Sequence, residues 1–182
     1  MKILLPINDW TLGQAQVDAV IPYLRFPHTT VLLVSVVEPM VAHTYRYGYG
    51  RLVEELNATQ RRCAENLLEK MKARLCGFCP QARIESRAFE GEAVSGLLAV
   101  ISNEQVDLVV VAQRRKHPLL KLFSRSVSDA LTACACCSTV VVKPQVWQGY
   151  GDNKKEGQVV SATVAYPLTS ETVKELASVE RT

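Results

Sequence analysis

Four near-continuous runs of Val, Ile and Leu constrain the fold of this chain more than any other feature. They occupy residues 2–7, 30–37, 106–111 and 139–142, and polar or proline residues bound each run. Strands with one exposed face alternate apolar and polar residues, whereas continuous apolar runs are typical of strands covered on both faces. The runs therefore predict a parallel sheet with helices on both sides.

A fifth strand and four helices complete the predicted pattern. Residues 82–89 alternate small or apolar side chains with charged ones, which favours a strand at the sheet edge. Segments with helical spacing separate the strands, and Pro22 weakens the first of them. These segments are 11–24, 51–75, 92–104 and 126–134. The alternation predicts an α/β fold, a five-stranded parallel sheet sandwiched by helices with right-handed crossovers.

The composition changes after Lys143, which divides the chain into two predicted parts. Residues 1–143 hold all five predicted strands and form the predicted domain. Residues 144–182 begin with a turn-rich polar stretch and are expected to be a linker and C-terminal extension. Within this extension, residues 158–167 could form one more strand and residues 169–180 a short helix.

Charge and hydropathy exclude several classes of partner. The net charge of +3 over 182 residues is too small to require a polyanionic partner, so no nucleic acid is expected. The first apolar run is interrupted by Asn8 and Asp9, too early for a signal peptide. No stretch approaches the roughly 20 apolar residues that span a bilayer. We expect a cytoplasmic protein without a membrane partner.

The six cysteines raise the question of redox or metal chemistry. Without an export signal, a disulfide framework is not expected. Cys76 and Cys79 have the spacing of a redox pair or zinc knuckle, but they follow a predicted helix, and Gly77 stands at its expected C-cap. A zinc site shared with Cys134 and Cys136 would join loops at opposite sheet edges, about 19 Å apart. We expect structural thiols and no metal, with a thiol redox protein as the alternative.

Positive charge gathers directly after the fourth predicted strand. Residues 114–125 contain Arg114, Arg115, Lys116, Lys121 and Arg125, and no acid. Ligands of doubly wound sheets bind beyond the carboxyl ends of the strands, where the strand order reverses. The basic loop is therefore a candidate anion site; the alternative is a solvated loop with no ligand.

Three stretches resemble a universal stress protein domain over residues 1–143. They are "KILLPIND", "RIESRAFEGEAVSGLLAVISNEQVDLVVVA" and "ACCSTVVVKP". The resemblance implies a Rossmann-like fold of the adenine nucleotide alpha hydrolase type and a non-enzymatic role in stress response or signalling. It also implies a homodimer formed through the last strand, at Thr139, Val140, Val141 and Val142.

The phosphate-binding motif of this family is altered in the chain. ATP-binding members carry glycine, two residues, glycine, nine residues, glycine and then Ser or Thr, because glycines let the backbone approach phosphates at a helix N-terminus. Here Ala112, Arg115 and Arg125 occupy the glycine positions, while Ser126 keeps the hydroxyl position. Asn8 replaces the usual aspartate after the first strand. The resemblance therefore implies weak or absent ATP binding.

A nucleotide sensor for ATP, AMP or a cyclic dinucleotide is the alternative function. Its two arginines at glycine positions would either bind phosphates or fill the phosphate site with side-chain bulk. Ser126 has a second interpretation as a helix N-cap, with Asp129 three residues later. No nucleophile–base pair stands out, so no catalysis is expected. The candidate ligand-binding residues are Pro6, Ile7, Asn8, Asp9, Val36, Ala112, Gln113, Arg114, Arg115, Lys116, Arg125, Ser126 and Val127.

Overall fold

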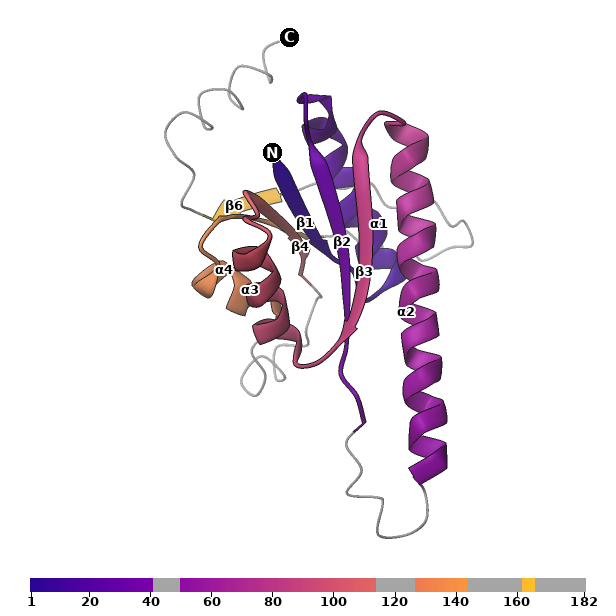
Figure 1. The fold of residues 1–182 in the computed structure, drawn as a ribbon. Coiled ribbons are helices and arrows are strands. Elements are labelled where there is room, and N and C mark those ends of the chain that lie inside the picture. Colours follow the sequence, from indigo (N-terminus) through magenta and orange to yellow (C-terminus); the bar gives the residue numbers. More distant parts are fainter. Residues whose placement is uncertain (41–49, 114–126, 144–161, 166–182) are drawn as a thin grey trace, which may run out of the picture.

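The computed structural model describes residues 1–40, 50–113, 127–143 and 162–165. These residues form one six-stranded sheet in the order β3-β2-β1-β4-β5-β6 (Figure 1). The first five strands are parallel, and β3 lies at the edge, so the predicted five-stranded parallel sheet is confirmed. The strands are β1 (Lys2–Pro6), β2 (Thr30–Val37), β3 (Arg83–Glu90), β4 (Leu108–Ala112), β5 (Ser138–Val142) and β6 (Ala162–Ala165).

Two layers of helices cover the sheet, α1 and α2 on one face and α3 and α4 on the other (Figure 1). Pro22 stands in the first turn of the 3₁₀ helix that continues α1. Gly77 lies inside α2, which ends at the next residue, so its prediction as a C-cap was wrong. The helices are α1 (Trp10–Val20), η1 (Ile21–Arg25), α2 (Gly50–Phe78), α3 (Ala93–Asn103) and α4 (Val127–Cys134).

β6 gives the sheet a boundary that differs from the predicted one. It runs antiparallel to β5 and pairs Val142 with Ala162 and Thr139 with Ala165. The extra strand predicted within residues 158–167 is thus present in part. The described structure therefore has no open edge at residues 139–142, where the predicted homodimer would form. The helix predicted at residues 169–180 lies outside the described residues.

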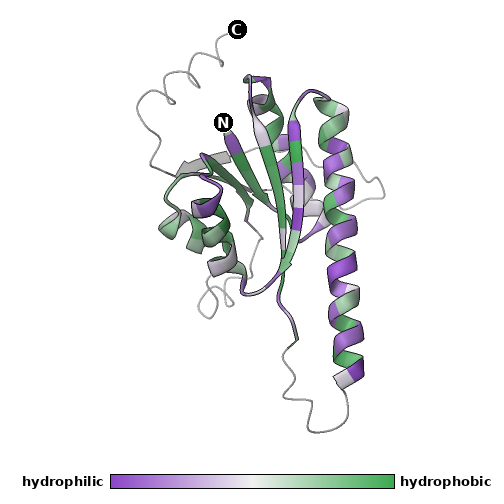
Figure 2. Ribbon diagram, in the orientation of Figure 1, coloured by the Kyte–Doolittle hydropathy of each residue, from purple (hydrophilic) through white to green (hydrophobic). Residues whose placement is uncertain are grey.

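The core has two halves because successive residues of a strand point to opposite faces. In β1, Ile3 and Leu5 pack with α1 and α2, whereas Leu4 packs with α3 and α4. Figure 2 shows apolar residues along the central strands and alternating polar and apolar residues along α2. This is the pattern expected for strands buried on both sides and helices buried on one. No helix in the described ranges is long and apolar enough to cross a membrane.

Met71 of α2 fills the space between α1 and the sheet. Its side chain is fully buried, and it lies close to the backbone of Gly13 in α1. A Cβ atom on Gly13 would lie 3.1 Å from Met71 Cε and 3.2 Å from Ile7 Cγ2. The glycine therefore lets α1 pack closely against both α2 and the end of β1.

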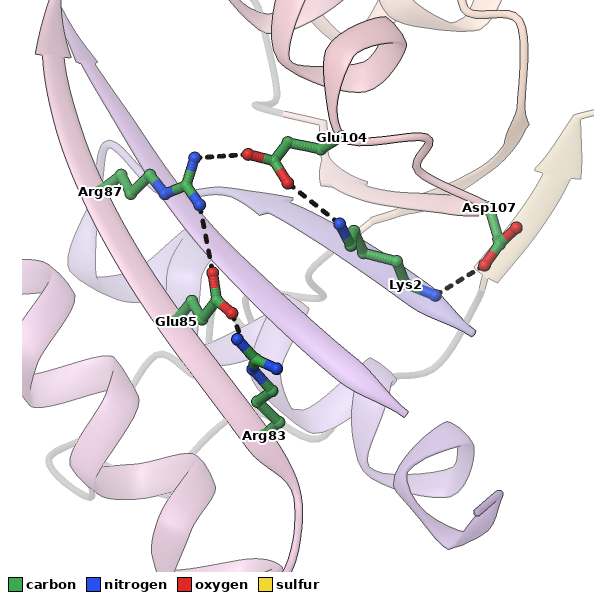
Figure 3. A network of polar contacts seen from close by, with 6 residues as sticks. All are labelled: Lys2, Arg83, Glu85, Arg87, Glu104 and Asp107. Atoms are coloured by element: carbon green, nitrogen blue, oxygen red, sulfur yellow. Dashed lines mark hydrogen bonds and ion pairs between the residues drawn. The ribbon is translucent and has the colours of Figure 1, made fainter. Parts of the chain in front are cut away.

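A network of ion pairs spans the exposed part of the sheet between β3 and β1 (Figure 3). Glu104, at the C-terminus of α3, binds Lys2 Nζ at 3.0 Å through Oε2 and the Arg87 guanidinium through Oε1. Arg87 also binds Glu85 at 3.2 Å, and Glu85 binds Arg83 at 2.9 Å. Hydrogen bonds from Lys2 and Arg87 lower the pKa of Glu104 below its usual value of 4.5. The network connects the C-terminus of α3 to β1 and β3 through side chains.

Replacing Met71 by Ala should destabilise the fold by roughly 2–5 kcal/mol, because a fully buried side chain leaves a cavity against α1. Urea unfolding followed by far-UV circular dichroism measures the change. Lys70→Ala, at an exposed neighbouring position, is the matched control and should change stability little. Equal losses for the two variants would contradict the described packing of α2.

Replacing Glu104 by Gln should lower stability at neutral pH, and the deficit should shrink in acid. The folded pKa of Glu104 is lowered, so its contribution is complete above the unfolded pKa and is lost as the pH falls through the folded pKa. Urea unfolding of both proteins at neutral pH and at several values below pH 4.5 measures this difference. Glu65→Gln, which breaks an exposed pair with Arg61, is the control and should have the smaller effect. A deficit that is constant with pH would contradict the described role of Glu104.

Candidate functional site

The strand order reverses between β1 and β4. From β1 the chain adds β2 and β3 on one side and then returns to place β4 on the other. β1 pairs with β2 over its full length, but with β4 only at Ile3↔Leu108 and Leu4↔Val109. Beyond these pairs, the carboxyl ends of β1 and β4 are not joined by a backbone ladder. This is the position at which doubly wound folds bind ligands.

Gln16 of α1 bridges the two strand ends. Its amide nitrogen donates to the carbonyl of Pro6 at 2.9 Å and to the carbonyl of Val110 at 3.0 Å. The side chain is 2% exposed; its bond to Val110 is buried and its bond to Pro6 is partly buried, and an unpaired carbonyl in such a place is costly. One carboxamide thus replaces the missing ladder and sets the spacing of β1 and β4 below the candidate site.

The turn after β1 is held by its own polar side chains. Ile7 is fully buried, and its N–H donates to the carbonyl of Val34 at 2.7 Å. Asn8 Oδ1 accepts a hydrogen bond from Ser35 Oγ at 3.1 Å, which ties the turn to β2. Asp9 has extended backbone and caps α1 by accepting from the N–H of Leu12 at 3.0 Å. Asn8 is exposed, and its side chain is an uncharged amide. The family that this chain resembles usually has an aspartate at this position.

The second half of the site follows β4. Ala112 pairs with Val142 of β5, and the N–H of Gln113 donates to the Val142 carbonyl at 2.8 Å. The Gln113 side chain donates to Asp129 Oδ1 at 3.3 Å, so it connects the end of β4 to the first turn of α4. An acid in that turn is favourable for the helix dipole. The start of the basic loop is therefore fixed to both β5 and α4.

The structure gathers eight of the thirteen predicted site residues at the carboxyl ends of the strands or at α4. Val36 lies near the end of β2, 7% exposed, and Val127 begins α4. Sequence reasoning missed Gln16 and Ser35. In the sequence, Gln16 is a polar residue on the apolar side of a helix, and Ser35 is a polar residue inside an apolar run. The predicted residues outside the described ranges are Arg114, Arg115, Lys116, Arg125 and Ser126.

The thiols do not form a second site within the described residues. Cys76 lies in the last turn of α2, and the Cys79 thiol lies 3.9 Å from the carbonyl of Leu24. Burial raises the pKa of the Cys137 thiol to about 11, which keeps it protonated at neutral pH. Across residues 1–40, 50–113, 127–143 and 162–165, no group of three or more His, Cys, Asp or Glu is placed to hold a metal ion.

Comparisons with known proteins agree with this geometry. Residues 1–143 match the family model described as the universal stress protein family. No curated protein matches the chain. Several solved structures share the fold, among them these three. One is universal stress protein UspA from Lactobacillus plantarum, at TM-score 0.63 and 15% identity over 78% of this chain and 96% of that one.

The other two structures contain nucleotides. A universal stress protein in complex with cAMP matches at TM-score 0.56 and 14% identity, over 79% of this chain and 96% of that one. A family member from Arabidopsis thaliana with AMP bound matches at TM-score 0.57 and 15% identity, over 84% of this chain and 97% of that one. At these identities the likeness shows the fold.

Gln16→Leu should destabilise the protein by roughly 1–3 kcal/mol for each carbonyl that loses its donor. Leu keeps the volume of the side chain but cannot donate to Pro6 or Val110. Urea unfolding measures the loss, and amide hydrogen exchange at the ends of β1 and β4 locates it. Gln14→Leu, two residues earlier in α1 and partly exposed, is the matched control. Equal effects of the two substitutions would contradict the bridging role.

Proposed function

Since the family model covers residues 1–143, the chain belongs to the universal stress protein family. On that premise, we propose that it is a non-enzymatic stress-response or signalling protein that does not bind ATP in the manner of the glycine-motif members. The observation that carries the proposal is the pair of arginines, Arg115 and Arg125, at the positions where that binding requires glycine.

The replacement of the motif glycines directly affects ATP binding. A phosphate cradle needs the backbone within hydrogen-bond distance of the phosphate oxygens, and a large side chain at the point of approach moves the ligand away. Ala112, at the first of the three positions, ends β4 and is paired to β5, so its backbone is held in the sheet. Two arginines at the other positions add bulk that glycine lacks.

The polar groups of the described site support a role without catalysis. Asn8 binds Ser35, Asp9 caps α1, and Gln113 binds Asp129. Each of these side chains thus has a structural partner close by. Catalysis by general acid or base requires a titratable group aimed at a substrate with its pKa matched to that task. The arrangement therefore favours a protein that binds or signals over an enzyme.

A nucleotide sensor is the second candidate, and the structural neighbours with cAMP and AMP favour it. Both ligands carry a single phosphate and require less of the glycine cradle than ATP. A guanidinium is suited to bidentate contact with one phosphate, and such charge-assisted bonds contribute roughly 1.5–3 kcal/mol each. In this version Arg115 or Arg125 recruits the ligand. A cyclic dinucleotide would be read by the same groups.

The double variant Arg115→Gly/Arg125→Gly should gain ATP binding that the native protein lacks. The substitutions restore the two glycines and remove the bulk from the phosphate position. Calorimetric titration of ATP into both proteins is the measurement, with AMP and cAMP titrated in parallel. Loss of AMP or cAMP binding in the variant would instead support the sensor, in which the guanidiniums recruit the phosphate.

Arg114→Gly/Lys121→Gly is the matched control for this experiment. It removes the same charge from the same loop but leaves both glycine positions unchanged. If charge alone governs binding, the two double variants will behave alike, and the affinity of the native protein will fall steeply with salt. Absence of binding by every form would mean that the loop is basic without a nucleotide role.

A further inference from the structure

β5 would be the exposed edge of the family's parallel sheet if the chain ended after it. Four of its five residues are Thr139, Val140, Val141 and Val142, all of which favour strands. An apolar edge strand exposes unpaired N–H and C=O groups and is a template for pairing with another chain. Such an edge needs a cover or a partner.

In this chain the cover is β6. It pairs with β5 along four consecutive positions, from Thr139↔Ala165 to Val142↔Ala162. In the strand order, β6 lies at the end of the sheet, next to β5; it is labelled in Figure 1. The backbone of β5 is thereby paired on both sides, with β4 on the inner side.

The direction of β6 is the same as that of a symmetric partner strand. Two copies that continue one sheet about a two-fold axis perpendicular to the strands place β5 antiparallel to the β5 of the partner. β6 is also antiparallel to β5 and contacts the same residues. It therefore occupies the position that a second copy would need, and the two pairings exclude each other.

We propose that β6 is an intramolecular cover for the β5 edge, which keeps two copies of this chain from pairing through that edge. Residues 143–161 connect the two strands, and an antiparallel return needs no crossover. Because the connection is covalent, β6 is present at a high effective concentration, so it outcompetes a second copy at micromolar protein. The cover is short, only four residues.

The test compares the full chain with a variant that ends at Gly157 and so lacks β6. Sedimentation velocity over the micromolar range should show a monomer for the full chain. For the truncated variant, the weight-average mass should rise toward twice that of its monomer as concentration increases. Amide exchange of Thr139–Val142 should be slow in the full chain and faster in the truncated variant at the lowest concentration.

A second variant weakens β6 without shortening the chain. Thr163→Pro/Val164→Pro removes two successive N–H groups, one of which faces β5 because neighbouring residues of a strand point their N–H groups to opposite sides. It should dimerise as the truncated variant does. Asn153→Pro/Lys154→Pro, in the connecting residues, is the matched control and should stay monomeric.

Four results would overturn the proposal. A full chain that dimerises as strongly as the truncated variant would show that β6 does not prevent pairing of two copies. A folded truncated variant that stays monomeric would show that the β5 edge does not pair. A dimer of the full chain that is lost on truncation would show that β6 pairs between copies. Unfolding of both the truncated and the double proline variants would make β6 an essential part of the fold and not a removable cover.

Discussion

The junction of β1 and β4 is the constraint on which the rest of the structure depends. The chain reverses its direction of sheet growth there, yet only two residue pairs join the strands. Gln16 supplies the remaining connection through Pro6 and Val110, and Pro6 itself has no N–H with which to extend a ladder. A buried side-chain amide thus stands where backbone bonds would otherwise be. It positions the two turns that form the candidate site.

The fold was predictable because burial on both faces leaves an unmistakable pattern. The runs at 30–37 and 139–142 correspond to β2 and to the last four residues of β5, and the alternating segment at 82–89 to the edge strand β3. α2 was also predicted, but its end was not. Gly77 resembles a C-cap in sequence, yet the helix continues through it to Phe78, and the N–H of Cys79 donates to the Leu75 carbonyl at 3.0 Å.

The candidate site was only partly predictable, for a physical reason. Asn8, Asp9 and Gln113 could be located, because strand ends in a parallel sheet share one edge. The partners of Asn8 and Gln113 could not be found, since Ser35, Asp129 and Val142 are far from them in sequence and no pattern indicates such hydrogen bonds. The pairing of β6 with β5 is of the same kind. A four-residue strand has a weak local signal, and the edge it joins is decided by the assembled sheet.

The candidate site and the covered edge share one residue. Val142 accepts the N–H of Gln113 through its carbonyl, on the side of β4, and pairs with Ala162 on the side of β6. Gln113 in turn binds Asp129 in the first turn of α4. The residue that precedes the basic loop is therefore one hydrogen bond from the strand that β6 covers. A shift of β5 along its axis would either move Gln113 or break its hydrogen bond to Val142. The pairing of β5 and the geometry at the start of the basic loop are thus set together, through the backbone hydrogen bond from Gln113 to Val142.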